Sequence, residues 1–207
     1  MKLKWLFFDL GGTIYDETHS DTDRIEKLLA KANYNISLNE FYSEMINASK
    51  HFESSAFSAA RRHFGIIENQ PYSNEKEILY SDAIDVVSKL SKSYHLAILA
   101  NQPTNTLDRL KRDGIFSYFE LCFLSECENL FKPDIRFFEY ALEKAGCSSD
   151  EAAMIGDRLD NDILPAKKIG MKTIRVVQGL HSSQRPLSSE SSPDFEVHTL
   201  SELFNIL

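Results

Sequence analysis

Apolar and polar residues alternate in blocks along the second half of this chain. Short apolar runs predict buried strands, and the longer stretches between them place apolar residues at helical spacing. We expect strands at residues 95–100, 121–124, 152–155, 173–177 and 195–197. We expect helices at residues 104–113, 135–145 and 162–169, each followed by a glycine, and a last helix capped by Thr199 and Glu202. Repeated strand–helix units of this length predict a parallel sheet with helices on both faces.

The first third of the chain has a different pattern. Residues 3–8 form an apolar run that ends at Asp9, which predicts a first buried strand, and about sixty helical residues follow. The first helical face comprises Ile25, Leu28, Leu29 and Ala32. Ser37 and Glu40 form a capping-box pattern that opens a second helix. The apolar stripe of that helix comprises Phe41, Met45, Ala48, Phe52, Ala56 and Ala59. A further helix is expected at about residues 74–91, with Ile78, Ile84, Val87 and Leu90 as its apolar residues.

The sequence therefore predicts an α/β fold: a doubly wound, Rossmann-like parallel sheet with a small all-helical insertion after its first strand. We assign residues 1–15 and 79–207 to the sheet-containing core and residues 16–78 to the helical insertion. Ligands of such sheets bind beyond the carboxyl ends of the strands.

Charge and cysteine content exclude several classes of partner. The net charge is −8, from 23 basic and 31 acidic residues, which argues against nucleic acid or an anionic membrane as a partner. The apolar stretch at residues 5–8 is too short for a secretory signal. Cys122, Cys127 and Cys147 fit neither a Cys-x-x-Cys pair nor a disulfide framework. We therefore expect a cytoplasmic protein with reduced thiols.

Acidic residues gather where the predicted strands end. Asp9 follows the first strand, and Asp157, Asp160 and Asp162 follow the strand at 152–155. Like charges in one site disfavour ionisation, so the cluster needs a cation or a lysine to stay charged. Oxygen ligands without histidine or thiolate suit Mg²⁺, which also binds substrate phosphate. The sequence thus predicts a Mg²⁺–phosphate site at this edge.

Four segments in order resemble the motifs of the haloacid-dehalogenase-like (HAD) hydrolase superfamily, in its helical-cap (subfamily I) phosphatase-like branch. They are residues 7–13 (Phe-Phe-Asp-Leu-Gly-Gly-Thr), residues 99–101 (Leu-Ala-Asn), Lys132-Pro133 and residues 156–162. The insertion at 16–78 resembles the family's helical cap, which closes over the sheet edge and selects the substrate.

The resemblance implies roles for these residues. Asp9 would be the nucleophile that forms an aspartyl-phosphate, and Lys132 would neutralise Asp9 and the transferred phosphoryl group. Asp9, the Gly11 carbonyl, Asp157 and Asp162 would hold Mg²⁺. Asn101, Lys132 and backbone N–H groups near Gly11 and Gly12 would bind phosphate oxygens.

Two positions depart from the family pattern. Gly11 stands where the phosphatases carry a second aspartate that acts as general acid and base, and Ala100 stands where a serine or threonine hydroxyl meets the phosphoryl group. Loss of a general acid typically lowers the rate by about 10²–10⁴. Asp16 or His19 is a candidate to supply the proton instead.

Three hypotheses follow. The first is a Mg²⁺-dependent phosphatase acting on a small phosphorylated metabolite, weakened by Gly11 and Ala100. The second is a catalytically impaired relative that binds a phosphate ligand or a protein partner and regulates it. The third is a metal-independent carbon–halogen hydrolase, a branch that also lacks the second aspartate but carries Asp-x-Tyr-Gly-Thr at its first motif. The acidic fourth segment favours the first hypothesis over the third, because a cation explains it better.

Overall fold

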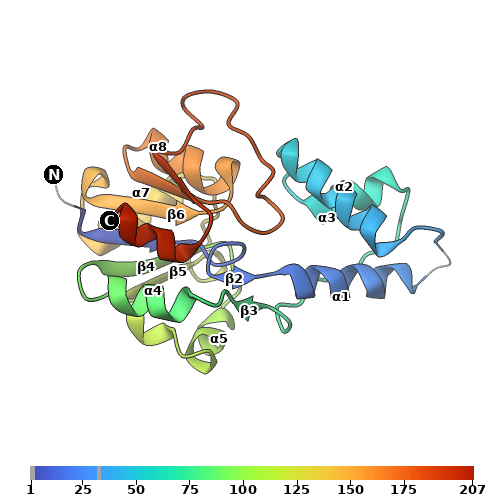
Figure 1. Cartoon of the computed structure of the whole chain (residues 1–207), viewed down its shortest axis with the longest axis horizontal. Coiled ribbons are helices and arrows are strands. Elements are labelled where there is room, and N and C mark those ends of the chain that lie inside the picture. Colours follow the sequence, from blue (N-terminus) through green and yellow to red (C-terminus); the bar gives the residue numbers. More distant parts are fainter. Residues whose placement is uncertain (1–2, 32–33) are drawn as a thin grey trace.

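A six-stranded parallel sheet forms the core of the larger part of the protein, which lies at the left in Figure 1. The computed structural model describes residues 3–31 and 34–207. The sheet order is β5-β4-β1-β6-β7-β8, so that the chain builds outward from β1 in both directions. The strands are β1 (Trp5–Phe8), β4 (His95–Ala100), β5 (Leu121–Leu124), β6 (Ala152–Gly156), β7 (Lys172–Val176) and β8 (Phe195–Val197). The predicted doubly wound α/β class is confirmed.

Helices cover both faces of the sheet, and the alternation of side chains along β1 shows which helix lies on which face. Leu6 and Phe8 pack with α4 (Ala83–Leu90), α5 (Thr106–Arg112) and the 3₁₀ helix η4 (Leu200–Asn205). Trp5 and Phe7 pack with α7 (Ile135–Ala145) and α8 (Leu164–Lys168). Because all four β1 residues are buried, β1 reads as a continuous apolar run.

Four short segments complete the described elements of this part of the chain. They are η1 (Phe116–Tyr118), α6 (Ser125–Glu128), η2 (Ser149–Glu151) and the π-helical turn η3 (Leu159–Ile163). The predicted helix at 162–169 therefore begins as the π turn η3, and regular α-helix starts only at Leu164, where Pro165 occupies the first turn. The predicted last helix is the 3₁₀ helix η4.

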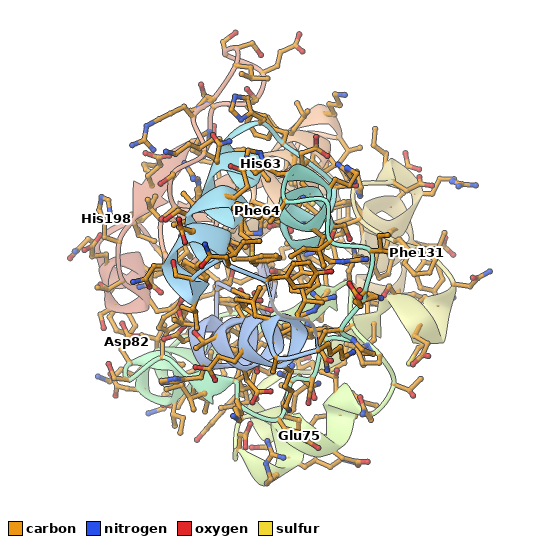
Figure 2. All side chains as sticks on the ribbon, turned by 90° about the vertical axis from the view of Figure 1, so that its right-hand side faces the viewer. His63, Phe64, Glu75, Asp82, Phe131 and His198 are labelled. Carbon is orange, nitrogen blue, oxygen red and sulfur yellow. The ribbon has the colours of Figure 1, made fainter. Side chains whose placement is uncertain are left out.

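Three helices with an apolar core of their own lie at one end of the molecule. They are α1 (Thr18–Leu29), α2 (Leu38–Lys50) and α3 (Ala56–His63). Ile25, Phe41 and Phe57 are buried in this helical region, and Figure 2 shows Phe64 between α2 and α3. The predicted capping box is present: the Glu40 N–H donates to Ser37 Oγ (3.2 Å), and the Ser37 N–H donates to Glu40 Oε2 (2.8 Å). Ala32, predicted to lie on the first helical face, falls outside the described residues.

The predicted stripe of the second helix is divided between two helices. The chain leaves α2 after Lys50, and Phe52 adopts a left-handed conformation with φ of 58° that no α-helix continues. The Ser55 hydroxyl then accepts a hydrogen bond from the Ser58 N–H and caps α3. Ala56 and Ala59 are buried as expected, but they belong to α3.

A two-stranded antiparallel ribbon joins the helical region to the sheet. It consists of β2 (Tyr15–Asp16) and β3 (Ile78–Leu79), in which Asp16 pairs with Ile78. The predicted helix at 74–91 is therefore wrong over its first half, and α4 begins only at Ala83. Ile78 is 50% exposed and Ile84 is 46% exposed, so neither belongs to an apolar stripe. Long-range pairing with β2 overrides the helical spacing there.

The loop between β7 and β8 contacts the helical region, beside which it lies in Figure 1. Gln184, which is fully buried, donates from Nε2 to the Ser49 carbonyl at the end of α2 (3.2 Å). The Ser49 hydroxyl lies 2.7 Å from His181 Nδ1. Arg175, buried on β7, holds this loop by donating to the carbonyls of His181 (2.9 Å) and Gln184 (3.2 Å).

Within the described ranges, 3–31 and 34–207, no helix is both long and apolar enough to cross a membrane.

The aromatic core of the helical region provides a test of its packing. Phe41 is fully buried, with ring centroids 5.3 Å from Phe57 and 5.9 Å from Phe64. We expect Phe41→Ala to lower the free energy of unfolding by about 3–5 kcal/mol, because it removes buried apolar area and leaves a cavity. Ile67→Ala, at a side chain that is 90% exposed, should change it by less than about 0.5 kcal/mol. Urea denaturation of both variants measures this, and similar losses would contradict the packing described here.

Candidate active site

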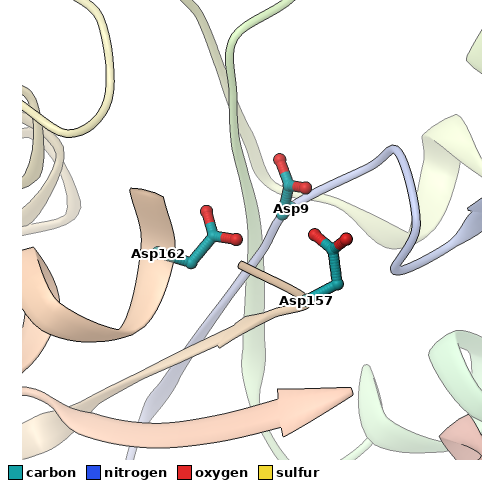
Figure 3. A group of neighbouring side chains, drawn as sticks. All are labelled: Asp9, Asp157 and Asp162. Carbon is teal, nitrogen blue, oxygen red and sulfur yellow. The ribbon is translucent and has the colours of Figure 1, made fainter. Parts of the chain in front are cut away.

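Three carboxylates converge at the carboxyl ends of the central strands. Asp9 follows β1, Asp157 follows β6, and Asp162 lies in the turn η3. One oxygen from each lies within 4.8 Å of the others, and Figure 3 shows the three side chains gathered in one place. Asp157 and Asp162 are buried, whereas the Asp9 side chain is 14% exposed. The sequence prediction that strand ends bring these residues together agrees with this arrangement.

Lys132 supplies positive charge to this cluster. Its Nζ lies 2.6 Å from Asp9 Oδ1 and 2.6 Å from Asp162 Oδ1, and its side chain is fully buried. Burial alone would lower the pKa of Lys132, but the Asp162 and Asp9 carboxylates outweigh burial and raise this pKa above its usual value. Lys132 is therefore an ammonium ion held between two carboxylates.

One ammonium does not compensate three carboxylates. Burial raises the pKa of Asp162 to about 6, even though Lys132 acts in the opposite direction. Burial, with the charges of Asp162 and Asp9, raises the pKa of Asp157 well above its usual value. Within the described part of the chain, no N–H or O–H group donates to the Asp157 carboxylate. This unpartnered buried carboxylate facing two others fits a hard cation.

Asn101, just after β4, fixes the backbone of Lys132. Its Nδ2 donates to the Lys132 carbonyl, and its Oδ1 accepts from the Lys132 N–H, both at 2.8 Å. One Nδ2 hydrogen is left over, because an amide nitrogen carries two. Asn101 thus positions Lys132 and keeps one donor for a ligand. Ala100, beside it, is buried and offers no hydroxyl.

The segment after Asp157 is held by its own polar contacts. The Arg158 N–H donates to Asp162 Oδ2 (3.0 Å), and the Arg158 side chain forms an ion pair with Asp160 (2.6 Å). Asp160 also accepts from Gln184 Nε2 (3.2 Å). Asp160 therefore faces the loop after β7 and does not join the three-carboxylate cluster.

The loop after Asp9 depends on its two glycines. Gly12 has φ of 68°, and a Cβ there would lie 2.8 Å from Asp157 Cγ. The Gly12 N–H donates to the Tyr15 carbonyl (2.8 Å), so the predicted use of this N–H for phosphate is not supported by the loop geometry. The Gly11 N–H makes no hydrogen bond within the described residues and remains available.

Glu17 is a site residue that the sequence analysis missed. A Cβ built on Gly11 would lie 2.6 Å from Glu17 Cδ and 2.9 Å from Oε2, so the Glu17 carboxyl fills the space beside Gly11. Burial, followed by the charges of Asp21, Asp157 and Asp9, raises the pKa of Glu17 to about 8.

Motif spacing gives no signal for Glu17. A tight turn brings the chain back beside Gly11 just before Glu17, because the Tyr15 N–H donates to the Leu10 carbonyl (2.9 Å) and Tyr15 forms a bridge with Gly11.

The candidate substitutes Asp16 and His19 are placed differently. The Asp16 carboxylate accepts from the Thr18 N–H (2.9 Å) at the start of α1, and His19 is exposed. Neither lines the cleft described next.

A cleft of about 860 Å³ opens between the helical region and the strand ends. The helical region contributes Glu17, Arg24 and Phe57, and the sheet side contributes Asn101, Arg109 and Arg158. The Arg24 guanidinium stacks 3.5 Å above the Phe57 ring. The cleft has room for a small molecule and offers both cationic and acidic groups to it.

Comparisons with known proteins agree with this geometry. The family model for haloacid dehalogenase-like hydrolases matches residues 3–170. The chain is 29% identical over 227 residues to a glyceraldehyde 3-phosphate phosphatase of Methanocaldococcus jannaschii, a match that covers 99% of this chain and 97% of that protein. It is 36% identical over 110 residues to a phosphoserine phosphatase of Thermus thermophilus, covering 53% of this chain and 43% of that protein.

Solved structures give the same picture. The fold matches the magnesium-bound HAD-hydrolase YfnB of Bacillus subtilis with a TM-score of 0.74 at 23% identity, covering 100% of this chain and 99% of that one. It also matches a HAD phosphatase of Thermococcus onnurineus with a TM-score of 0.67 at 26% identity, covering 99% and 97%. Since the family model spans most of the sequence and the fold agrees, this chain belongs to the haloacid dehalogenase-like hydrolases.

Proposed function

We propose that this protein is a magnesium-dependent phosphatase that hydrolyses a small phosphorylated metabolite through an aspartyl-phosphate on Asp9. The observation that carries the proposal is the buried cluster of Asp9, Asp157 and Asp162 around Lys132, at strand ends beside a cleft. This arrangement combines a nucleophile, a fixed positive charge and oxygen donors for a cation.

Asp9 acts as the nucleophile. Its Oδ1 accepts from Lys132, which orients the carboxylate, and the other oxygen is left to attack phosphorus. The new bond joins Asp9 to phosphorus as the ester P–O bond breaks, and the leaving oxygen takes up a proton. Water then attacks the phosphorus of the aspartyl-phosphate, loses a proton and releases inorganic phosphate and free Asp9.

Three groups bind the phosphoryl oxygens. Lys132 neutralises developing charge from a buried position, where a fixed ammonium is most effective. The remaining Asn101 Nδ2 hydrogen and the Gly11 N–H provide neutral donors. Gly12 contributes by its left-handed conformation, which shapes the loop next to Asp157.

The donor set fits Mg²⁺, which takes carboxylate, carbonyl and water oxygens. Asp9, the Gly11 carbonyl and Asp157 would hold the ion directly. Asp162, whose two oxygens also accept from Lys132 and the Arg158 N–H, would hold the ion directly or through a water. A bound Mg²⁺ would offset the carboxylate charge and polarise the phosphoryl group.

The helical region, residues 16–78 in our assignment, serves as the cap that selects the substrate. Relatives named for glyceraldehyde 3-phosphate and phosphoserine support a small phosphorylated metabolite. The net charge of −8 gives no support for a nucleic-acid or membrane partner. Three free cysteines support a cytoplasmic location.

The alternative is a catalytically impaired relative that binds a phosphate ligand or a protein partner. Gly11 and Ala100 favour it, because position 11 brings no carboxylate and position 100 no hydroxyl to the phosphoryl group. Absence of turnover with retained phosphate-analogue binding would identify it.

The first prediction concerns the nucleophile. The parent protein should hydrolyse p-nitrophenyl phosphate in Mg²⁺ and lose this activity in EDTA. Asp9→Asn should lower the rate by about 10³ or more, because an amide cannot form the aspartyl-phosphate. It should also abolish binding of beryllofluoride with Mg²⁺, an acyl-phosphate mimic.

Asp85→Asn is a matched control on the exposed surface of α4 and should behave as the parent. Equal beryllofluoride binding by the parent and Asp9→Asn would show that Asp9 is not the acceptor.

The second prediction concerns the metal. Asp157→Asn should weaken Mg²⁺ binding by about tenfold or more in titration calorimetry, because it removes an anionic ligand. Asp160→Asn, at a carboxylate paired with Arg158, should change the affinity by less than about threefold.

The Mg²⁺ affinity of the parent should also fall as the pH drops through about 6. The pKa of Asp162 is raised to about 6, so this carboxyl takes up a proton there and the proton competes with the ion; burial and neighbouring charges raise the pKa of Asp157 as well. Equal affinities of parent and Asp157→Asn would refute this assignment of the ion.

A further inference from the structure

We propose that Glu17 carries the proton for both chemical steps, in place of the carboxylate that position 11 lacks. This inference rests on the proposed phosphatase function and names the general acid and base of the same site. As acid, Glu17 gives its proton to the leaving oxygen while the ester P–O bond breaks. As base, it takes a proton from the water that attacks the aspartyl-phosphate, which restores the starting state of Glu17.

The first support is the space that Glu17 occupies. The Glu17 carboxyl lies where a side chain at position 11 would begin. A Cβ placed on Gly11 would be 2.6 Å from Glu17 Cδ and 2.9 Å from Glu17 Oε2. Gly11 does not have a positive φ, so its backbone conformation does not require glycine. What position 11 lacks is therefore room for a side chain, because a carboxyl from residue 17 fills that room.

The second support is the local geometry of Glu17. It follows β2 directly and stands at the N-cap of α1, where a side chain commonly accepts a hydrogen bond from the first helical turn. Glu17 makes no such bond. The Thr18 N–H donates instead to the Asp16 carboxylate. The Glu17 side chain turns toward Gly11 and leaves the helix end to its neighbour.

The third support is the network behind Glu17. The Tyr72 hydroxyl lies 3.3 Å from Glu17 Oε1 and 2.7 Å from Glu77 Oε1, and Glu77 forms a buried ion pair with Arg109. The hydroxyl has a single hydrogen and can also accept. It therefore donates to Glu17 as a carboxylate, or donates to Glu77 and accepts from Glu17 as a carboxylic acid. The same contact holds Glu17 in both forms that an acid–base cycle requires.

The fourth support is access. Glu17 lines the cleft together with Asn101 and Gln102, which follow β4. A phosphate ester bound at Asp9 with its organic group in this cleft would present its leaving oxygen on the side where Glu17 lies. Asp21 also lines the cleft, but it lies one helical turn further along α1.

The test compares leaving groups. The initial rates of p-nitrophenyl phosphate and glycerol phosphate hydrolysis are measured in Mg²⁺ for the parent, Glu17→Gln and Asp16→Asn. Glu17→Gln keeps the size of the side chain but cannot exchange a proton. It should lower the rate on glycerol phosphate by about 10²–10⁴, and the rate on the good aryl leaving group much less. Asp16→Asn, a matched change one residue away, should keep the parent's ratio of the two rates.

A second variant tests the equivalence of the two positions. In the Gly11→Asp/Glu17→Ala double variant, a carboxylate comes from residue 11 and the space it needs is free. Relative to Glu17→Ala, this variant should recover at least about tenfold in the rate on glycerol phosphate. Beryllofluoride binding at Asp9 should be retained in all variants, which checks that they fold and that the nucleophile is intact.

The outcomes separate the two proposals. If beryllofluoride binds and Glu17→Gln hydrolyses both esters within about threefold of the parent, Glu17 is not the acid–base group, and the phosphatase proposal stands. If the parent neither hydrolyses p-nitrophenyl phosphate nor binds beryllofluoride, both proposals fall together.

Discussion

The need to keep several carboxylates together at one buried edge of the sheet governs the arrangement of this site. Asp157 and Asp162 are withdrawn from water, and Asp9 faces them from the next strand end. Burial and mutual repulsion both oppose ionisation of such a group. Lys132 meets this constraint in part, because it places one ammonium within 2.6 Å of two of the three carboxylates. The remaining negative charge favours a bound cation, and the cation would in turn attract an anionic phosphoryl group.

The surrounding fold holds this electrostatic arrangement in place. Parallel pairing of β1 with β4 and β6 brings the loops after these three strands to one edge. Asn101 holds a fourth loop there, the one after β5, through two hydrogen bonds to the Lys132 backbone. Arg175 donates to the Asp157 carbonyl (3.2 Å) and to the loop after β7. A displaced partner would leave a buried polar group unpaired, which is costly. The network therefore favours one arrangement of these loops more strictly than apolar packing alone would.

The sequence predicted the sheet and its strand-end residues well, because both follow from local patterns. Apolar runs mark buried strands, and parallel topology then carries Asp9, Asn101 and Asp157 to the same edge. It did not predict contacts that depend on pairing between distant segments. Ile78 and Ile84 have helical spacing, yet Ile78 pairs with Asp16 across the insertion. Glu17 reaches the site through the tight turn at residues 10–15, and no periodic pattern encodes the shape of that turn. The interruption at Phe52 was also missed, because a left-handed residue inside an apolar stripe has no periodic signature.

The contact between the helical region and the loop after β7 differs in kind from the rest of the packing. Its hydrogen bonds join Ser49 to Gln184 and His181, and the partly buried Leu180 packs against the apolar core of the helical region. A hydrogen bond contributes only about 1 kcal/mol net, since water replaces it when it opens. We therefore expect this hydrogen-bonded contact to separate at a low free-energy cost and to re-form with the same partners. His181, which takes part in this contact, also lines the cleft, so separation of the contact would expose that wall of the cleft to solvent while the apolar cores on either side stay intact.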